Sequence, residues 1–145
     1  MNVTIATSIK HGNYKHLQDR ANRLVHFVGI WEAKLKQYIN YHPDVELSIC
    51  PIRKAEITGQ ANLGANKIEI DPRYTLRQQC KTIIHELIHN EQVNQHRLEV
   101  GIRWKWDNVF YENDSDTEKY TTLPWEVEAR TRTKEIFSDI FGSLN

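Results

Sequence analysis

Two histidines and a glutamate near the middle of the chain have the types and the spacing of a zinc hydrolase centre. The stretch His85-Glu86-Leu87-Ile88-His89 follows the pattern H-E-x-x-H. On a helix, residues four apart project from the same side about one turn apart, which suits two ligands of one tetrahedral zinc ion. Glu86 lies about 100° further round the helix, where it can act on a zinc-bound water but is poorly placed as a ligand. The motif therefore predicts a zinc-dependent hydrolase, most simply a peptidase.

A catalytic zinc site also needs a third protein ligand and an open position for water. Glu126 shares one face of the expected last helix with largely apolar residues, and a carboxylate on such an inward face is costly unless it is paired. Glu128 lies roughly opposite, where the helix dipole stabilises an exposed acid in the first turn. We therefore favour Glu126 as the third ligand. The alternatives are Glu128, the sequence-near His96 and the distant His42.

These residues predict metal-assisted hydrolysis of a peptide bond. Zinc lowers the pKa of its bound water toward neutrality. Glu86 accepts the proton of that water as a general base and later passes it to the leaving amine. The oxyanion needs a hydrogen-bond donor besides zinc, and we prefer Tyr120, because the acidic segment before Pro124 could fold over the cleft. The other candidate donors are Tyr111, His96 and Arg97.

The residues around the motif predict the helix that must position it. Thr75-Leu76-Arg77-Gln78 is a capping-box pattern, in which Thr75 caps the helix and Gln78 reaches back. The helix is expected to run to about Gln95. Its apolar stripe falls roughly opposite the two histidines, so one face should pack on the core and the other should face a cleft. The residues of this stripe are Leu76, Cys80, Ile83, Ile84 and Leu87.

The rest of the chain supplies a second long helix, short strands and an aromatic segment. We expect the strand over 67–70 to be an edge strand that could hold an extended peptide by strand addition. The aromatic group is expected to form a small satellite core, with a hydrophobic substrate surface as the alternative. Its members are Trp104, Trp106, Phe110, Tyr111 and Trp125. In chain order, the expected elements are a helix over 14–40, strands over 45–49, 54–58 and 67–70, a turn over 61–66, a hairpin over 101–111, an acidic surface loop over 112–118 and a helix from Pro124.

These segments together resemble the small gluzincin-type zinc metallopeptidases. The strand Ile68-Glu69-Ile70-Asp71, the H-E-x-x-H helix and the later stretch Glu126-Val127-Glu128-Ala129 are similar to phage-encoded and bacterial metallopeptidase domains of the ImmA/IrrE group. Leu123-Pro124-Trp125 and Trp104-Lys105-Trp106 add to the resemblance to the phage proteins, which spans roughly residues 66–133.

The resemblance implies an α+β, zincin-like fold with a small mixed or antiparallel sheet, the motif helix and a C-terminal helix that carries the third ligand. A further N-terminal helix is expected from the sequence pattern and has no counterpart that we assign to the family. The resemblance also implies one catalytic zinc ion held by His85, His89 and Glu126, with Glu86 as the general base.

Composition narrows the class of protein. The 145 residues carry no formal net charge, and we expect one domain over 1–145 with its own core. The neutral balance argues against a general grip on nucleic acid, and no apolar run is long enough to span a bilayer. The start lacks a secretory signal pattern, and two cysteines are too few for a disulfide framework. We therefore expect a cytoplasmic protein, in the host cytoplasm if phage-encoded, that acts on a polypeptide; its oligomeric state stays open.

Two other functions are compatible with the motif. A zincin scaffold without catalysis could serve as a protein-binding module, although such a module has no need of Glu86 beside the metal. A protease that acts on DNA-bound proteins is the second alternative, and nothing basic or cysteine-rich favours it. The SprT-like DNA-repair proteases share H-E-x-x-H, but they use a third histidine and usually a cysteine-rich zinc ribbon, which two cysteines cannot supply.

Overall fold

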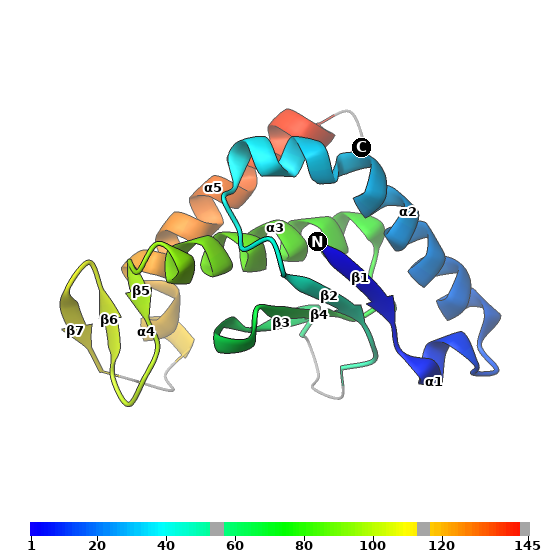
Figure 1. The fold of residues 1–145 in the computed structure, drawn as a ribbon, viewed down its shortest axis with the longest axis horizontal. Helices are drawn as coiled ribbons and strands as arrows, with labels where there is room; N and C mark the ends of the chain where they lie inside the picture. The colour runs from blue at the N-terminus through cyan, green and yellow to red at the C-terminus, as the bar shows by residue number, and fades with distance from the viewer. Residues whose placement is uncertain (53–56, 113–116, 143–145) are drawn as a thin grey trace.

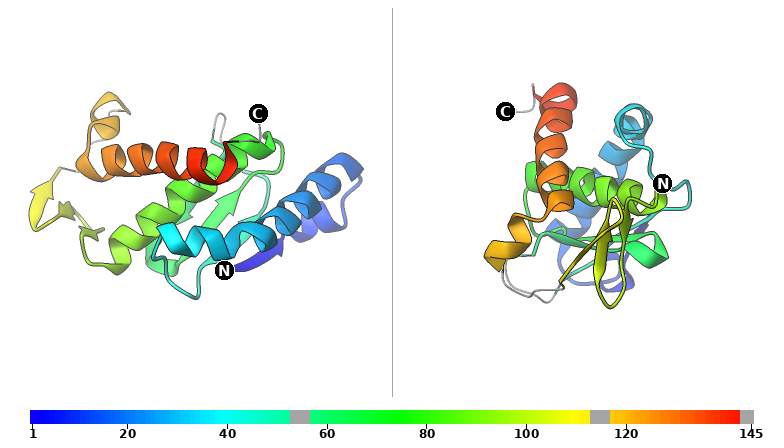
Figure 2. Two further views of the ribbon diagram at one scale, coloured as in Figure 1. Left: turned by 90° about the horizontal axis from the view of Figure 1, so that it is seen from above. Right: turned by 90° about the vertical axis from the view of Figure 1, so that its left-hand side faces the viewer.

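The computed structural model describes residues 1–52, 57–112 and 117–142. In these ranges the protein is mixed α+β, with five α-helices and two small sheets. The helices α2, α3 and α5 lie on one side of the larger sheet, and the smaller sheet follows the C-terminal end of α3 (Figure 1, Figure 2). None of the helices in the described ranges is long and apolar enough to cross a membrane. The elements are β1 (Asn2–Ile5), α1 (Thr7–Lys10), α2 (Lys15–Tyr38), β2 (Glu46–Ile49), β3 (Gly59–Asn62), η1 (Leu63–Ala65), β4 (Lys67–Ile70), α3 (Leu76–Asn94), β5 (Leu98–Glu99), β6 (Trp104–Trp106), β7 (Val109–Tyr111), α4 (Thr117–Thr121) and α5 (Pro124–Phe141).

The larger sheet is mixed, with the strand order β1-β2-β4-β3. The strands β1, β2 and β4 run parallel, whereas β3 runs antiparallel to β4. Alternate side chains of β2 and β4 are buried in the main core, as the period-two pattern predicts. The strand expected over 67–70 is confirmed as β4, but the expectation that it is an edge strand is wrong. Because β2 and β3 both pair with β4, the edge on this side of the sheet is β3.

The N-terminal segment also joins this sheet. Residues 2–5 pair in parallel with β2, and the short helix α1 follows. We expected neither element, because four residues carry too little apolar pattern to separate a strand from a loop. The long helix expected over 14–40 is confirmed as α2. Its buried residues are Ala21, Leu24, Val28 and Leu35.

The helix α3 begins with the expected capping box. The Thr75 hydroxyl oxygen accepts a hydrogen bond from the Gln78 backbone N–H at 3.2 Å, and Gln78 Oε1 accepts one from the Thr75 N–H at 3.1 Å. The helix ends at Asn94, and its expected apolar stripe is buried apart from Leu76, which is partly buried. The motif therefore lies inside a helix that is fixed at its start by a cap and along its length by the core.

The helix α5 packs along α3 in the opposite direction. It begins at Pro124, as expected for a proline at the first helical position. Glu126 lies near the motif histidines, whereas Phe137 lies under Arg77 and Lys81 near the start of α3. The inward face assigned from the sequence is confirmed by burial. This face contains Glu126, Ala129, Thr133, Phe137 and Ile140.

Two connecting segments differ from their predictions. Of the strand expected over 54–58, residues 54–56 lie outside the described ranges, and Ile57 and Thr58 are not in a strand. The strand β3 instead occupies 59–62, and the turn follows it as η1 with Asn66 in the left-handed conformation at φ 50°. Of the loop expected over 112–118, residues 113–116 lie outside the described ranges, and the helix α4 begins at Thr117. The strand β3 and the helix α4 are both too short for a periodic pattern in the sequence to reveal them.

The smaller sheet contains the expected hairpin. The strands β6 and β7 pair around Asp107 and Asn108, whose φ angles of 45° and 68° suit a two-residue hairpin turn. The strand β5, which we did not expect, adds a third strand. The expected satellite core is present, with the rings of Trp104 and Trp125 stacked at 5.3 Å between centroids. Phe110 does not belong to it, because this side chain is 59% exposed.

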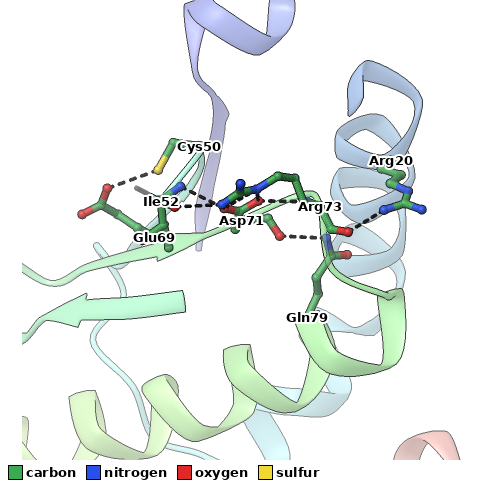
Figure 3. A network of polar contacts seen from close by, with 7 residues as sticks. All are labelled: Arg20, Cys50, Ile52, Glu69, Asp71, Arg73 and Gln79. Carbon is green, nitrogen blue, oxygen red and sulfur yellow. Dashed lines mark hydrogen bonds and ion pairs between the residues drawn. The ribbon is translucent and has the colours of Figure 1, made fainter. Parts of the chain in front are cut away.

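A buried carboxylate joins the end of β4 to two neighbouring segments. Figure 3 shows the Asp71 side chain between the loop after β2 and the residues before α3. Its oxygens accept hydrogen bonds from the Ile52 N–H at 2.9 Å and from the Arg73 guanidinium at 2.6 Å. Burial alone would raise the pKa of Asp71, but the hydrogen bonds from Arg73 and Ile52 outweigh burial and lower it. The charged carboxylate therefore stabilises the fold.

Replacement of this carboxylate should destabilise the protein in a pH-dependent way. We expect Asp71→Asn to lower the free energy of unfolding by about 2 kcal/mol at pH 7, because charge-assisted hydrogen bonds to a buried group are lost. The folded-state pKa of Asp71 lies below its ordinary value of 3.8. The stabilisation is therefore fully present above that value and is lost as the pH falls through the folded-state pKa. Urea unfolding of both proteins between about pH 7 and pH 3 measures this difference.

Asp19→Asn is the matched control, because Asp19 is exposed and, among the described residues, pairs only with exposed Lys15. It should change the stability by less than about 0.5 kcal/mol. A difference between wild type and Asp71→Asn that stays constant down to pH 3 would contradict the assigned role of the Asp71 charge.

Candidate metal centre

Side chains from two helices meet at one point beside the larger sheet. His85 and His89 project from α3, and Glu126 projects from the first turn of α5. The two histidine Nε2 atoms are 3.0 Å apart. The Glu126 carboxylate oxygens lie 3.3 Å from His85 Nε2 and 2.9 Å from His89 Nε2. The three side chains therefore form a group that could hold a metal ion.

The spacing and chemistry of these atoms fit a three-ligand metal site. Ligand atoms at about 2.0–2.1 Å from a tetrahedral zinc ion are about 3.3 Å from one another, close to the observed separations. The donors are two imidazole nitrogens and one carboxylate oxygen, a set that leaves a fourth position open. The two Nε2 atoms face each other, and only one hydrogen bond can form between them, whereas a shared cation would satisfy both lone pairs.

Glu126 and His89 each stabilise the charged form of the other. Burial raises the pKa of Glu126, but hydrogen bonds from His85 and His89 outweigh burial, so this pKa lies well below its ordinary value. Burial likewise lowers the pKa of His89, and the hydrogen bond and charge of Glu126 outweigh it and raise that pKa. A proton and a metal ion would compete for the same atoms, so metal affinity should weaken at low pH.

Glu86 lies beside these three side chains, which we call the metal-ligating group because they could hold a metal ion, without belonging to the group. Among the described residues, that group contains only His85, His89 and Glu126. The Glu86 side chain is half-buried and borders the clefts on both sides of the group. Burial raises its pKa above the ordinary value of a glutamate. This placement is the one expected for a residue that faces the metal site but does not bind the metal.

Tyr120 reaches the same centre from α4. Its hydroxyl hydrogen-bonds to the Glu126 carboxylate, and its ring borders the cleft next to His89. Burial, together with the hydrogen bond and charge of Glu126, raises the pKa of Tyr120, so the hydroxyl keeps its proton at neutral pH and can donate it to a hydrogen bond. The structure thus brings our preferred donor to the site, and its role toward an oxyanion stays a prediction.

The other candidates lie outside the metal-ligating group. Glu128, expected on the exposed face, is half-buried. It forms an ion pair with Arg97, whose Nη1 lies 3.0 Å from Glu128 Oε1. Arg97 also lies over the Trp106 ring, 4.5 Å from its centroid, so it is occupied away from the metal-ligating atoms. His96 lies in the exposed turn after α3, and His42 lies in the turn before β2. Tyr111 packs against the satellite core.

Comparison with known proteins identifies no relative. No protein-family model, curated protein or solved structure matches this chain. The resemblance to the ImmA/IrrE group therefore stays a prediction from short segments, and the function has to be inferred from the residues and their geometry.

Gln92 holds one of the two motif histidines, a contact that we did not predict. Its Oε1 lies 2.8 Å from His89 Nδ1. Its amide group donates to Glu128 Oε2 at 2.6 Å and to the Trp125 carbonyl oxygen at 3.1 Å. With its amide committed to these acceptors, Gln92 presents its oxygen to His89, so Nδ1 carries a proton. Nε2 is then the nitrogen that would bind a metal, which would replace the proton that Nε2 shares with Glu126. The sequence signal is position: Gln92 lies three residues after His89 on the same helix face.

The fully buried Gln92 side chain should therefore affect both metal binding and folding. We expect Gln92→Met to weaken zinc binding about tenfold, because the imidazole loses the partner that fixes its orientation. We also expect it to lower the free energy of unfolding of the metal-free protein by about 1–3 kcal/mol, because buried acceptors lose their donor. Competition with a fluorescent chelator measures the first effect, and urea unfolding measures the second.

Gln95→Met is the matched control, because Gln95 is exposed at the end of the same helix and contacts Glu91 rather than a histidine. It should keep the wild-type zinc affinity. Wild-type affinity in Gln92→Met as well would show that Gln92 does not orient His89.

Two clefts flank the metal-ligating group, and His85 and Glu86 border both. The first has a volume of about 470 Å³ and the second about 400 Å³. Gly59 on β3 also borders both clefts. A Cβ at this position would lie 2.6 Å from Thr82 Cγ2 and 2.8 Å from the Glu69 backbone oxygen, so a larger residue would force β3, β4 or α3 to shift. The edge strand therefore forms a shared wall opposite the motif helix.

Proposed function

We propose that this protein is a zinc-dependent metallopeptidase of the zincin type, with His85, His89 and Glu126 as the zinc ligands. One observation carries the proposal. The three ligand atoms all lie within 4.8 Å of one another, beside the non-ligating carboxylate of Glu86 and between two clefts. Two imidazoles, one carboxylate and an open position are a donor set of catalytic zinc sites, although iron(II) also uses it. The H-E-x-x-H spacing, with Glu86 beside the two histidines, is what favours zinc.

The arrangement of the elements supports the same function. A mixed sheet, a motif helix and a third ligand on a C-terminal helix are the features that the resemblance implies for the fold. The edge strand β3, rather than 67–70, borders both clefts together with His85 and Glu86. An extended peptide that added to this edge would pass in front of the metal-ligating group. Peptide-bond hydrolysis therefore suits the cleft better than hydrolysis of a compact small molecule.

The residues of the chain take separate roles in the proposed reaction. When bound, zinc lowers the pKa of a coordinated water and polarises a carbonyl group. Glu86 accepts a proton from the attacking water and returns it to the leaving amine. Tyr120 donates its hydroxyl hydrogen to the developing oxyanion, after exchanging its partner Glu126 for the substrate. Gln92 keeps His89 in the tautomer that leaves Nε2 free to bind.

Removal of the metal tests this function. The zinc-loaded protein is expected to cleave members of a mixed peptide library, with the new ends identified by mass spectrometry. A chelator should abolish cleavage, because the ligands alone cannot activate water, and stoichiometric zinc should restore it. A protein that binds zinc tightly and cleaves no peptide in the library would instead be a non-catalytic scaffold.

A further inference from the structure

The two clefts beside the metal-ligating group differ in the chemistry of their walls. The first cleft is bordered by three cationic side chains, Lys81 from α3 and Arg130 and Lys134 from α5. Glu86 is the only acidic residue among the described residues that border it. The chain as a whole has no net charge, so this is a local excess of positive charge and not part of a generally basic surface.

The cations of this cleft are available to a ligand. In the described part of the chain, neither Lys81 nor Lys134 forms an ion pair with an acidic side chain, and Lys134 is exposed. The Lys81 Nζ lies 5.1 Å from the centroid of the Phe137 ring, a contact with the ring face that leaves its N–H groups able to donate to a carboxylate. Arg130 donates to the Thr121 carbonyl oxygen and remains exposed. Three cations that border one hollow and that form no ion pair with a described acidic residue are suited to bind carboxylates.

The positive charge continues away from the metal-ligating group. A neighbouring hollow of about 280 Å³ shares Lys81 and Lys134 with the first cleft and is also bordered by Arg77. The cationic wall therefore extends past the space that one side chain would fill. A segment with more than one acidic residue matches this length better than a single carboxylate does.

The second cleft is aromatic. It is bordered by Leu63, Trp104, Tyr120 and Trp125. The stacked rings of Trp104 and Trp125 form one wall, and the hydroxyl end of Tyr120 points to Glu126. An apolar side chain that enters this cleft would bury its surface against rings that already pack together. The two sides of the metal-ligating group thus favour opposite kinds of side chain.

The direction of β3 orders these preferences along a substrate. The residue before this strand, Thr58, borders the cationic cleft, whereas Leu63 after it borders the aromatic cleft. An antiparallel peptide added to β3 would therefore run from the aromatic cleft to the cationic cleft, and antiparallel pairing is slightly the more stable.

We propose that the protein selects polypeptide segments with an apolar side chain before the scissile bond and acidic side chains after it. The acidic side chains bind between Lys81, Arg130 and Lys134. This inference rests on the proposed peptidase function, because it names the substrate class of the same site.

Binding to an uncleaving variant tests the preference separately from catalysis. Labelled peptides of equal length would carry a phenylalanine followed by Asp-Glu, by Asn-Gln or by Lys-Lys, and a fourth would carry Asp-Glu before the phenylalanine. Fluorescence anisotropy with zinc-loaded Glu86→Gln gives the Kd of each. We expect the first peptide to bind at least about tenfold more tightly than the lysine peptide at low salt, with the difference shrinking as salt is added.

The charge-reversed variant Lys134→Glu, in the same Glu86→Gln background, should reduce this ratio to about threefold or less, because it removes one cation and adds one anion. Lys10→Glu, an exposed lysine on α1 outside both clefts, should leave the ratio unchanged. Equal Kd values for the acidic and lysine peptides would overturn the proposal. Tighter binding of the peptide with Asp-Glu before the phenylalanine than of the peptide with Asp-Glu after it would also overturn it. Displacement of the acidic peptide by a lower concentration of a single-stranded oligonucleotide would overturn it in favour of phosphate recognition. Failure of the peptidase function itself would be seen in the peptide-library experiment, as absence of cleavage by the zinc-loaded wild type.

Discussion

Replacing Glu126 with glutamine is expected to lower the zinc affinity by more than about 100-fold, because a neutral amide oxygen replaces the only anionic ligand of the site. Because Glu126 is buried, neither water nor another described carboxylate can easily replace it as a ligand. The Glu126 side chain is only 6% exposed, and the described acidic residue beside it, Glu86, is not among the metal-ligating atoms. Zinc stoichiometry by atomic absorption, together with chelator competition, measures the effect.

Two variants on the same helix provide the comparison. Glu135→Gln changes an exposed acid that is remote from the centre and should keep wild-type zinc affinity. Glu128→Gln should lose affinity about tenfold, because Glu128 acts on His89 only through Gln92. If Glu128→Gln lost the metal and Glu126→Gln kept it, the third ligand would be Glu128 and the assignment of the inward helix face would be wrong.

Replacing Glu86 with glutamine is expected to separate metal binding from catalysis. The variant should keep its zinc within a few-fold of wild-type affinity, because Glu86 is not among the ligating atoms. Its kcat/KM for peptide cleavage should fall by about 10²–10⁴-fold, which is the usual contribution of a positioned general base. The measurement is the rate of cleavage of one identified peptide at saturating zinc.

Glu135→Gln again serves as the control, now for cleavage, and thermal unfolding of the zinc-loaded proteins checks that each variant is folded. Full activity in Glu86→Gln would remove Glu86 from its role as base. Loss of zinc from this variant would show that Glu86 is a ligand after all.

The parts of the site that could be predicted from the sequence depend on local patterns. The cap at Thr75 and Gln78, the apolar stripe of α3 and the four-residue spacing of His85 and His89 are all encoded within one helix. Glu126 could also be assigned, because its helix face is readable from the periodicity of α5 alone. In each case the prediction required only the direction in which a side chain leaves its own helix.

The parts that could not be predicted depend on which segments become neighbours. The strand β4 has the same alternating pattern whether it is an edge or an interior strand, and only its pairing with β2 and β3 decides. Gln92 orients His89 by means of acceptors that α5 supplies, so its role is invisible until the two helices are packed together. A side chain at Gly59 would crowd Thr82 and the Glu69 backbone oxygen, contacts that the sequence does not reveal.

The position of Glu126 has a consequence for how the protein unfolds. Its predecessor Trp125 belongs to the apolar cluster of the smaller sheet, whereas Ala129, one turn later, belongs to the main core. A metal held between Glu126 and the α3 histidines would bridge the junction of these two clusters and resist their separation. Zinc would then stabilise the contact between the two clusters as well as take part in the reaction. Metal-free protein should lose amide-hydrogen protection in β5, β6 and β7 before it does so in β2 and β4, and zinc should merge the two events into one cooperative opening.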